Sequence, residues 1–330
     1  MADKQQNQFP WMNPRKILVK KEAATNPGFG KKPEERGTKE LLEYGIVNID
    51  KPSGPSSHQV SAYVKKILHI DKSGHSGTLD PKVTGVLPVA LGKGTRIVQS
   101  LLTAGKEYVC LMQVHADVDE KKLRQTMMCF LGEINQLPPV RSAVKRQERK
   151  RTIYYIDIIE IIGREVLFRV GCQAGTYIRK LCSDIGQKLG CGAHMAELRR
   201  TMAGPFNEDT LCTLQELTDA YHYYNEKQED KQLRRLVMPV ERGAEHLHKV
   251  WVLDNAVNTL CHGAYLNIPG ISKLEDGINP GDKVAVLTLK DELISVGIAQ
   301  MGSEEVMKKS KGLFIKSEQV FMEPETYSKN

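Results

Sequence analysis

The chain has little of several features that mark common protein classes. Its seven cysteines are odd in number and none forms a CxxC pair, which excludes a locally encoded disulfide framework or zinc site. No apolar run approaches the roughly 18 residues of a membrane span, and the opening segment MADKQQNQFPWMNPRK lacks the apolar core of a signal peptide. We therefore expect buried thiols in a reducing compartment, cytoplasmic or, in a nucleated cell, nuclear, and no membrane association.

The excess of positive charge is also small. The chain has 47 Lys and Arg against 40 Asp and Glu, a net charge of +7 that decides little about partners. Clustering is more informative, because six cations share one short window with a single acid, Glu148: Arg141, Lys145, Arg146, Arg149, Lys150 and Arg151. In isolation this window is typical of a solvated loop between strands, whereas beside an RNA-processing site it favours contact with phosphates.

The length and patterning predict two folded units. Residues 1–41 are rich in Lys, Asn, Gly and Pro without sustained periodicity, which is typical of an extended arm that orders only against something else. Residues 42–246 alternate apolar strands with amphipathic helices, and residues 249–322 carry strands and tight turns typical of a small β-barrel. Residues 323–330 form a tail. The predicted fold class is α+β, a mixed α/β domain followed by the barrel.

The periodicity also assigns individual elements. In the larger unit it predicts strands at 46–50, 86–91, 107–114, 152–161 and 165–170, and helices at 56–68, 95–102, 120–131, 177–189 and 214–224. In the smaller unit it predicts strands at 250–254, 264–271, 281–289, 293–301 and 313–322.

One loop stands out for its chemistry. The segment GHSGTLDPKVTG, residues 74–85, is too rich in glycine to be regular, and it holds Asp80. Gly77 and Gly85 allow turns while Pro81 stiffens the position after the aspartate, so the loop can present a carboxylate rigidly to a cleft. On local evidence alone, an aspartate that caps a turn would be the simpler interpretation.

Four ordered blocks change that interpretation: NIDKPSGPSSH, HSGTLDPKVTGVLPVALGKGTR, KEYVC and GTYIRKL. Together they resemble the TruB-type pseudouridine synthases, over the chain from about residue 42 to its end. The segments PPVRSAVKR and GAHMAELRRT are most similar to the archaeal and eukaryal Cbf5 (dyskerin-like) branch. The strand-rich tail, with HGAYLNIPGI and GDKVAV, resembles a PUA RNA-binding domain.

The resemblance implies that Asp80 is the catalytic carboxylate. It would initiate breakage of the C1′–N1 bond of a uridine in RNA, after which the base rotates and rejoins through C5. Because this isomerisation gains no atoms and loses no electrons, no cofactor or metal is expected. A uridine in folded RNA must first be flipped out of its stack, at a cost of a few kcal/mol that aromatic stacking offsets in part.

The same resemblance assigns the neighbours of Asp80. Arg179 would hold the carboxylate ionised and oriented, although a surface cation on its helix is the bland alternative. Tyr108 would stack on the flipped base, and Tyr177 would be a second active-site tyrosine; each could instead simply pack. His75 would lie near the flipped nucleotide, or bond to backbone in a turn.

Two further residues receive supporting roles. Lys51, with the proline that follows it, would support the Asp80 loop, and Leu181 would belong to the wall of the substrate pocket.

Target selection stays open at this stage. The first alternative is the catalytic subunit of an H/ACA guide ribonucleoprotein acting on rRNA, which implies a guide RNA and Nop-type, Gar-type and kink-turn-binding accessory proteins, in the cytoplasm of an archaeal-like cell or the nucleolus of a eukaryote. The second is a stand-alone synthase for uridine 55 in the T-loop of tRNA, and a protein of this branch could also carry both activities. A non-catalytic RNA-binding scaffold is a third, and a carboxylate-pair glycosidase a fourth, which the lack of a second acid in the Asp80 loop disfavours.

Overall fold

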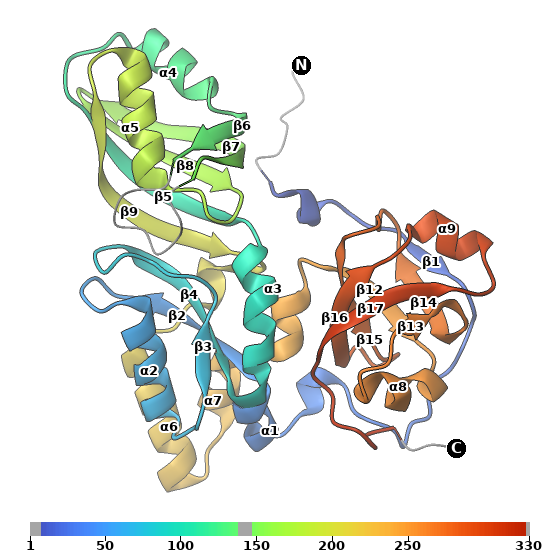
Figure 1. The fold of residues 1–330 in the computed structure, drawn as a ribbon. Coiled ribbons are helices and arrows are strands. Elements are labelled where there is room, and N and C mark those ends of the chain that lie inside the picture. The colour runs from blue at the N-terminus through green and yellow to red at the C-terminus, as the bar shows by residue number, and fades with distance from the viewer. Residues whose placement is uncertain (1–7, 138–146, 328–330) are drawn as a thin grey trace.

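The computed structural model describes residues 8–137 and 147–327. Two β-sheets, each with its own helices, lie side by side, and the N-terminal segment runs along the second of them (Figure 1). This confirms the predicted fold class of a mixed helix and strand domain followed by a smaller, strand-rich one. Within the described ranges, no helix is long and apolar enough to cross a membrane.

The larger sheet has ten strands, in the order β11-β2-β4-β9-β5-β8-β7-β6, with β10 on β9 and β3 on β4. Their bounds are β2 Gly45–Lys51, β3 Ser73–His75, β4 Thr84–Leu91, β5 Lys106–Val114, β6 Gly132–Gln136, β7 Arg149–Ile162, β8 Glu165–Cys172, β9 Ala193–Ala203, β10 Phe206–Asn207 and β11 Val237–Pro239. Its two halves meet where β4 and β9 pair in parallel over only two positions, Thr84 with Arg199 and Gly85 with Arg200. That junction lies directly after the Asp80 loop.

Local sequence signals mark one end of each of two helices in this unit. Ser56 and Gln59 form a capping box for α2, and Gly190 ends α5 in the left-handed conformation at φ 82°. The bounds are α1 Thr38–Glu43, α2 Ser57–Ile67, α3 Val98–Thr103, α4 Glu120–Met128, α5 Ile178–Leu189, α6 Leu214–Lys227 and α7 Lys231–Leu236. The predicted helix at 95–102 is in fact a 3₁₀ turn, η3 Gly92–Ile97, followed by α3.

The smaller sheet has seven strands in the order β1-β14-β12-β15-β16-β17-β13. Their bounds are β1 Ile17–Val19, β12 His248–Val252, β13 Leu266–Asn267, β14 Ile271–Glu275, β15 Lys283–Leu287, β16 Leu293–Ala299 and β17 Leu313–Val320, with helices α8 Asp254–Cys261 and α9 Ser303–Lys308. The short 3₁₀ turns are η1 Pro10–Met12, η2 Pro33–Glu35, η4 Glu208–Thr210, η5 Val240–Ala244 and η6 Ile268–Gly270.

The N-terminal arm is ordered against both units. β1 adds an antiparallel edge strand to β14, and Arg15 donates to the carbonyl of Leu247 and pairs with Glu275, each through Nη1. Phe9 is fully buried and stacks on Trp11 with ring centroids 4.2 Å apart. The arm therefore contributes hydrophobic burial and main-chain pairing to the fold.

One apolar cluster spans both units. Ile97, Leu101 and Phe206 from the larger unit pack with Trp251 and Phe321 from the smaller one, and all five are buried. Since burying such side chains is the main source of folding free energy, the two sheets stabilise each other.

Other predictions of local structure were also wrong, among them the strand at 264–271, where β13 has only two residues and η6 follows. The basic window is not a loop throughout, because Arg149, Lys150 and Arg151 begin β7 and pair with the unpredicted strand β6. The irregular segment is shorter than 74–85, since Gly74 and His75 lie in β3. The cysteines are not all buried either: Cys129, the C-cap of α4, is exposed, and Cys191 is partly buried.

Candidate active site

The Asp80 loop is hydrogen-bonded to the segment that connects β2 to α2 and to the first residue of α2. The amide of Leu79 donates to Ser57 Oγ at 2.8 Å, and the amide of Gly54 donates to the Pro81 carbonyl at 2.9 Å. Gly77 and Gly85 have φ of 130° and 101°, which confirms that both ends of the loop need glycine. The loop is thus fixed by its neighbours while the Asp80 carboxylate stays accessible.

Lys51 reinforces this arrangement from inside the protein. Its side chain is fully buried, and Nζ donates to the carbonyls of Pro52, Pro81 and Val83 at 2.9, 3.0 and 2.9 Å. Burial lowers the pKa of Lys51, Arg200 lowers it further, and Asp80 opposes the shift. The geometry places Lys51 as a support of the loop, on the side away from solvent.

Arg179 meets Asp80 from the other half of the sheet. α5 buries Ile178, Leu181 and Cys182, and this leaves Arg179 on its first turn, where its Nη2 forms an ion pair with Asp80 Oδ2. The ion pair therefore connects the Asp80 loop to the first turn of α5.

Stability does not account for this ion pair. The side chains of Asp80 and Arg179 are 54% and 58% exposed. Exposed pairs of this kind contribute only about 0–1 kcal/mol to folding. A charged pair held across two halves of a sheet, yet open to solvent, is suited to a ligand.

Tyr108 lies on β5 opposite Arg200 of β9. Its side chain is partly buried, and burial raises the pKa of its hydroxyl while the Arg200 guanidinium opposes that rise. Arg200 in turn donates to the Gly77 carbonyl at 3.4 Å, so Tyr108 and the Asp80 loop share one neighbour.

The other predicted site residues take different positions. Tyr177 is the N-cap of α5, and its amide and carbonyl bond to the side chain of Gln136 at 2.9 and 3.2 Å. His75 is partly buried on β3; burial, His58 and Arg200 lower its pKa, so its ring is neutral near pH 7. Leu181 is fully buried in the core under α5, where it positions the helix rather than lining an open pocket.

The basic window falls partly outside the described residues, which exclude Arg141, Lys145 and Arg146. Arg149, Lys150 and Arg151 lie on β7 next to β6, whose Gln136 holds the start of α5. Lys150 is 71% exposed and pairs with Glu133. These three cations are thus linked to the helix that carries Arg179 through a single intervening strand.

Sequence reasoning missed two buried cations. Arg200 is 1% exposed, and Lys106 is 5% exposed with Nζ donating to the carbonyls of Leu101, Leu102 and Ala104. Burial, with the charge of Arg200, lowers the pKa of Lys106 to about 7. The only available signal was their place inside the blocks KEYVC and GAHMAELRRT.

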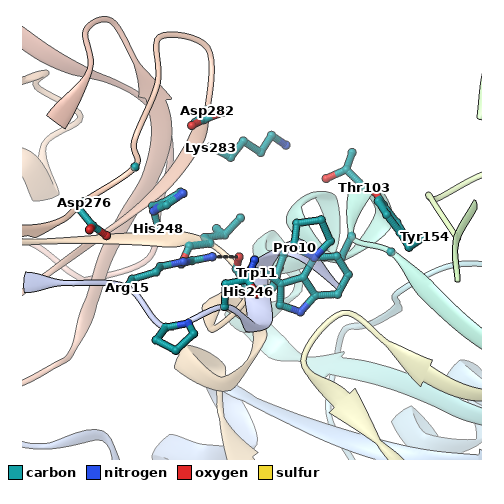
Figure 2. A pocket seen from close by; sticks show the side chains of 16 residues that line it. Pro10, Trp11, Arg15, Thr103, Tyr154, His246, His248, Asp276, Asp282 and Lys283 are labelled. Atoms are coloured by element: carbon teal, nitrogen blue, oxygen red, sulfur yellow. Dashed lines mark hydrogen bonds between the residues drawn. The ribbon is translucent and has the colours of Figure 1, made fainter. Parts of the chain in front are cut away.

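A sizeable cavity lies elsewhere. It has a volume of about 530 Å³ and is lined by the arm, the end of α3 and the start of the smaller unit (Figure 2). Trp11, Tyr154, His246 and Lys283 face it, whereas Asp80 does not. Across the described part of the chain, no group of three or more His, Cys, Asp or Glu could hold a metal ion.

Comparison with known families covers nearly the whole chain. Residues 65–178 match the N-terminal domain of TruB family pseudouridylate synthases, and residues 179–245 match the tRNA pseudouridylate synthase B C-terminal domain. Residues 6–61 match the DKCLD domain and residues 248–321 the PUA domain.

Individual relatives agree. Probable tRNA pseudouridine synthase B of Pyrococcus horikoshii is 56% identical over 96% of this chain and 95% of its own length. The Methanopyrus kandleri protein of the same name is 52% identical over 100% and 97%.

Solved structures extend the agreement to three dimensions. A chain from the crystal structure of a Cbf5-Nop10-Gar1 complex is 53% identical with a TM-score of 0.95, over 98% of this chain and 99% of its own. A chain from the H/ACA RNP bound to a substrate RNA containing 2′-deoxyuridine is 52% identical with a TM-score of 0.91, over 98% and 99%. With this coverage and identity, the chain belongs to the TruB family of pseudouridylate synthases.

Proposed function

We propose that this protein isomerises uridine to pseudouridine in RNA, with Asp80 as the catalytic carboxylate. The observation that carries the proposal is the exposed Asp80–Arg179 pair, which joins the lysine-supported loop to the first turn of α5 in a chain of this family. In the reaction the C1′–N1 bond breaks and a C1′–C5 bond forms. C5 loses its proton and N1 gains one, so the overall change is an isomerisation.

Each neighbour has a physical task in this proposal. Arg179 orients the carboxylate through a charge-assisted hydrogen bond. Tyr108 offers an aromatic ring on which the flipped base stacks, and His75 and Tyr177 line the approach. Lys51 and Leu181 act from within the fold, on the loop and on α5 respectively.

We further propose that the chain works as the catalytic subunit of a guide ribonucleoprotein. Its similarity to chains solved in Cbf5-Nop10-Gar1 and in a substrate-bound H/ACA RNP supports guide RNA, Nop-type and Gar-type partners, and a kink-turn-binding protein by family resemblance. The basic window, Arg141 to Arg151, would contact RNA phosphates. The compartment would be the cytoplasm, or the nucleolus in a eukaryote.

A second candidate is stand-alone modification of tRNA uridine 55. The name "tRNA pseudouridine synthase B" of the relatives favours it. Both can be tested together: the purified protein is incubated with bare tRNA and with a target oligonucleotide, each with and without guide RNA and accessory proteins. If pseudouridine forms only on bare tRNA, and not on the target oligonucleotide with guide RNA and accessory proteins, guide dependence is rejected.

The chemical proposal rests on one substitution. Asp80→Asn keeps the shape but removes the charge, and we expect the single-turnover rate to fall at least about a thousandfold, on the scale seen for loss of a catalytic nucleophile. RNA affinity should change less than about twofold, because the loop stays bonded through its backbone.

The matched control is Asp71→Asn, an exposed aspartate outside the site, which should turn over at the wild-type rate. Turnover by Asp80→Asn near the wild-type rate would reject Asp80 as the catalytic group. Turnover absent from the wild-type protein on every substrate would leave the non-catalytic scaffold as the better account.

A further inference from the structure

Arg200 is the residue at which the parts of the candidate site converge. Its guanidinium is 1% exposed; Nε donates to the Val86 carbonyl at 2.7 Å, and Nη2 donates to the Gly77 carbonyl at 3.4 Å. Arg200 is also the cross-strand partner of Tyr108 on β5 and of Gly85 on β4. Directly paired residues on adjacent strands point to the same face, so Arg200 and Tyr108 lie against one another.

Both ends of the Asp80 loop rest on this residue. A Cβ on Gly77 would lie 3.8 Å from Arg200 Nη1, and a Cβ on Gly85 would lie 2.2 Å from the Arg200 carbonyl oxygen. The loop that carries Asp80 therefore begins on the side chain of Arg200 and ends on its backbone.

Folding stability alone does not explain a guanidinium in this place. Burial lowers the pKa of Arg200, which shows that its charge is held against a desolvation cost. Among the described residues, no carboxylate forms an ion pair with it. Its side chain donates to the carbonyls of Val86 and Gly77, and Tyr108 is its cross-strand neighbour.

The neighbouring cation cannot take over these contacts. Lys106 directs its three hydrogen bonds to the carbonyls at the end of α3, at 2.6 to 3.0 Å. The carbonyls of Gly77 and Val86 are left to Arg200.

We propose that Arg200 is a positioning residue that holds the Asp80 loop and Tyr108 in one arrangement, so that carboxylate and aromatic ring meet the same nucleotide. This proposal rests on the proposed function of Asp80 and Tyr108. It assigns Arg200 no contact with the substrate, because its side chain is buried.

The first test is Arg200→Lys, which keeps the charge but loses the two-pronged geometry of the guanidinium. We expect kcat on the substrate that the wild-type protein converts to fall roughly 10- to 100-fold, the scale for a misplaced reacting group, with KM within about twofold. Arg199→Lys is the matched control. Arg199 directly precedes Arg200 on β9 and pairs with Asp50 and Glu208. The Arg199→Lys enzyme should turn over at close to the wild-type rate.

A double-mutant cycle with Tyr108→Phe adds a readout that a purely structural role would not move. If Arg200 acts through Tyr108, Arg200→Lys should cost several-fold less in the Tyr108→Phe protein than in the wild type. Independent effects, in which the two fold-losses simply multiply, would overturn the proposal.

Hydrogen–deuterium exchange of the whole chain serves as the control for correct folding of the variants. Arg200→Lys should raise exchange in residues 76–84 while β14 and β15 stay protected; unchanged exchange in the loop would overturn the proposal. Arg200→Met, which needs no buried charge, is the second variant should Arg200→Lys not fold, and the same fall in kcat is expected.

Wild type and Asp80→Asn are measured in parallel, so that the two proposals fail separately. An active Asp80→Asn rejects the proposed function. An inactive Asp80→Asn together with an Arg200→Lys enzyme at the wild-type kcat rejects only the role of Arg200.

Discussion

Single side chains in this protein separate chemical tasks from supporting ones by their exposure. Asp80 and Arg179 are more than half exposed, whereas Lys51 and Arg200 are almost completely buried although they too are charged. A buried cation is costly unless its donors are satisfied, and here backbone carbonyls of the Asp80 loop accept from both. The loop is consequently shaped by cations that do not reach the solvent.

Lys51 provides a prediction at this scale. Lys51→Met removes three hydrogen bonds and leaves buried carbonyls without donors, so the free energy of unfolding should fall by about 1–3 kcal/mol. The rate of pseudouridine formation should fall as well, because the Asp80 loop loses its inner support. Urea denaturation and single-turnover assays measure both, with Lys82→Met, on the exposed side of the same loop, as the control. Equal stability of the two variants would contradict this role.

Residues within recognised motifs were predicted from the sequence, whether exposed like Asp80 or buried like Lys51, whereas the role of the buried Arg200 was not. Asp80, Tyr108 and Arg179 were predicted through their motifs, and the structure brings Asp80 and Arg179 into contact. Arg200 could not be predicted, because an Arg-Arg pair has the same composition whether its side chains face solvent or carbonyls. Their assignment to opposite faces needs the pairing of β9 with β5.

At the scale of elements, strand β9 shows why part of the fold was not predicted. Its sequence AHMAELRRTMA contains few β-branched or aromatic residues and alternates poorly, so it lacks the usual strand signal. It nevertheless pairs with β4, β5 and β10 and joins the two halves of the sheet. By contrast, α2 and α5 carry clear caps and apolar faces and were predicted within one residue at each end.

The start of β7 provides the prediction for elements. Neutralising Arg149, Lys150 and Arg151 to Gln should weaken RNA binding and reduce the slope of log K against log salt by roughly 2 to 3, about 0.7–0.9 for each phosphate that the protein no longer neutralises. The control replaces three cations of α2 and α6 with Gln: Lys65, Lys66 and Lys227. Filter binding at several salt concentrations measures this slope. A slope that the β7 triple variant leaves unchanged would show that these cations are solvated and do not contact RNA.

At the scale of the whole molecule, the cavity in Figure 2 lies where the arm meets both units. His246 lies within it, 9% exposed, with Nε2 3.3 Å from the Ser100 carbonyl oxygen. Burial lowers the pKa of His246 to about 4; the Ser100 carbonyl opposes that shift, while Lys106, Arg15 and Lys283 add to it.

The packing of the arm and the two units around His246 should therefore be less stable in acid. A histidine whose pKa is lower in the folded state stabilises the fold above its unfolded pKa of about 6.5, and that stability is lost as the pH falls toward 4. We expect a loss of up to about 3 kcal/mol over this range, measured by urea denaturation. His246→Gln should flatten this part of the profile and His262→Gln should not; equal profiles for wild type and His246→Gln would contradict the assignment.

The pairing of β1 with β14 also has a consequence for folding during synthesis of the chain. Residues 17–19 leave the ribosome roughly 250 residues before their partner strand. At roughly 5–20 residues per second this is a wait of about 12 to 50 seconds, during which the segment has no strand to join. Strand β1 therefore waits for its partner, and the edge of the C-terminal sheet that it covers forms only after β1 has been synthesised.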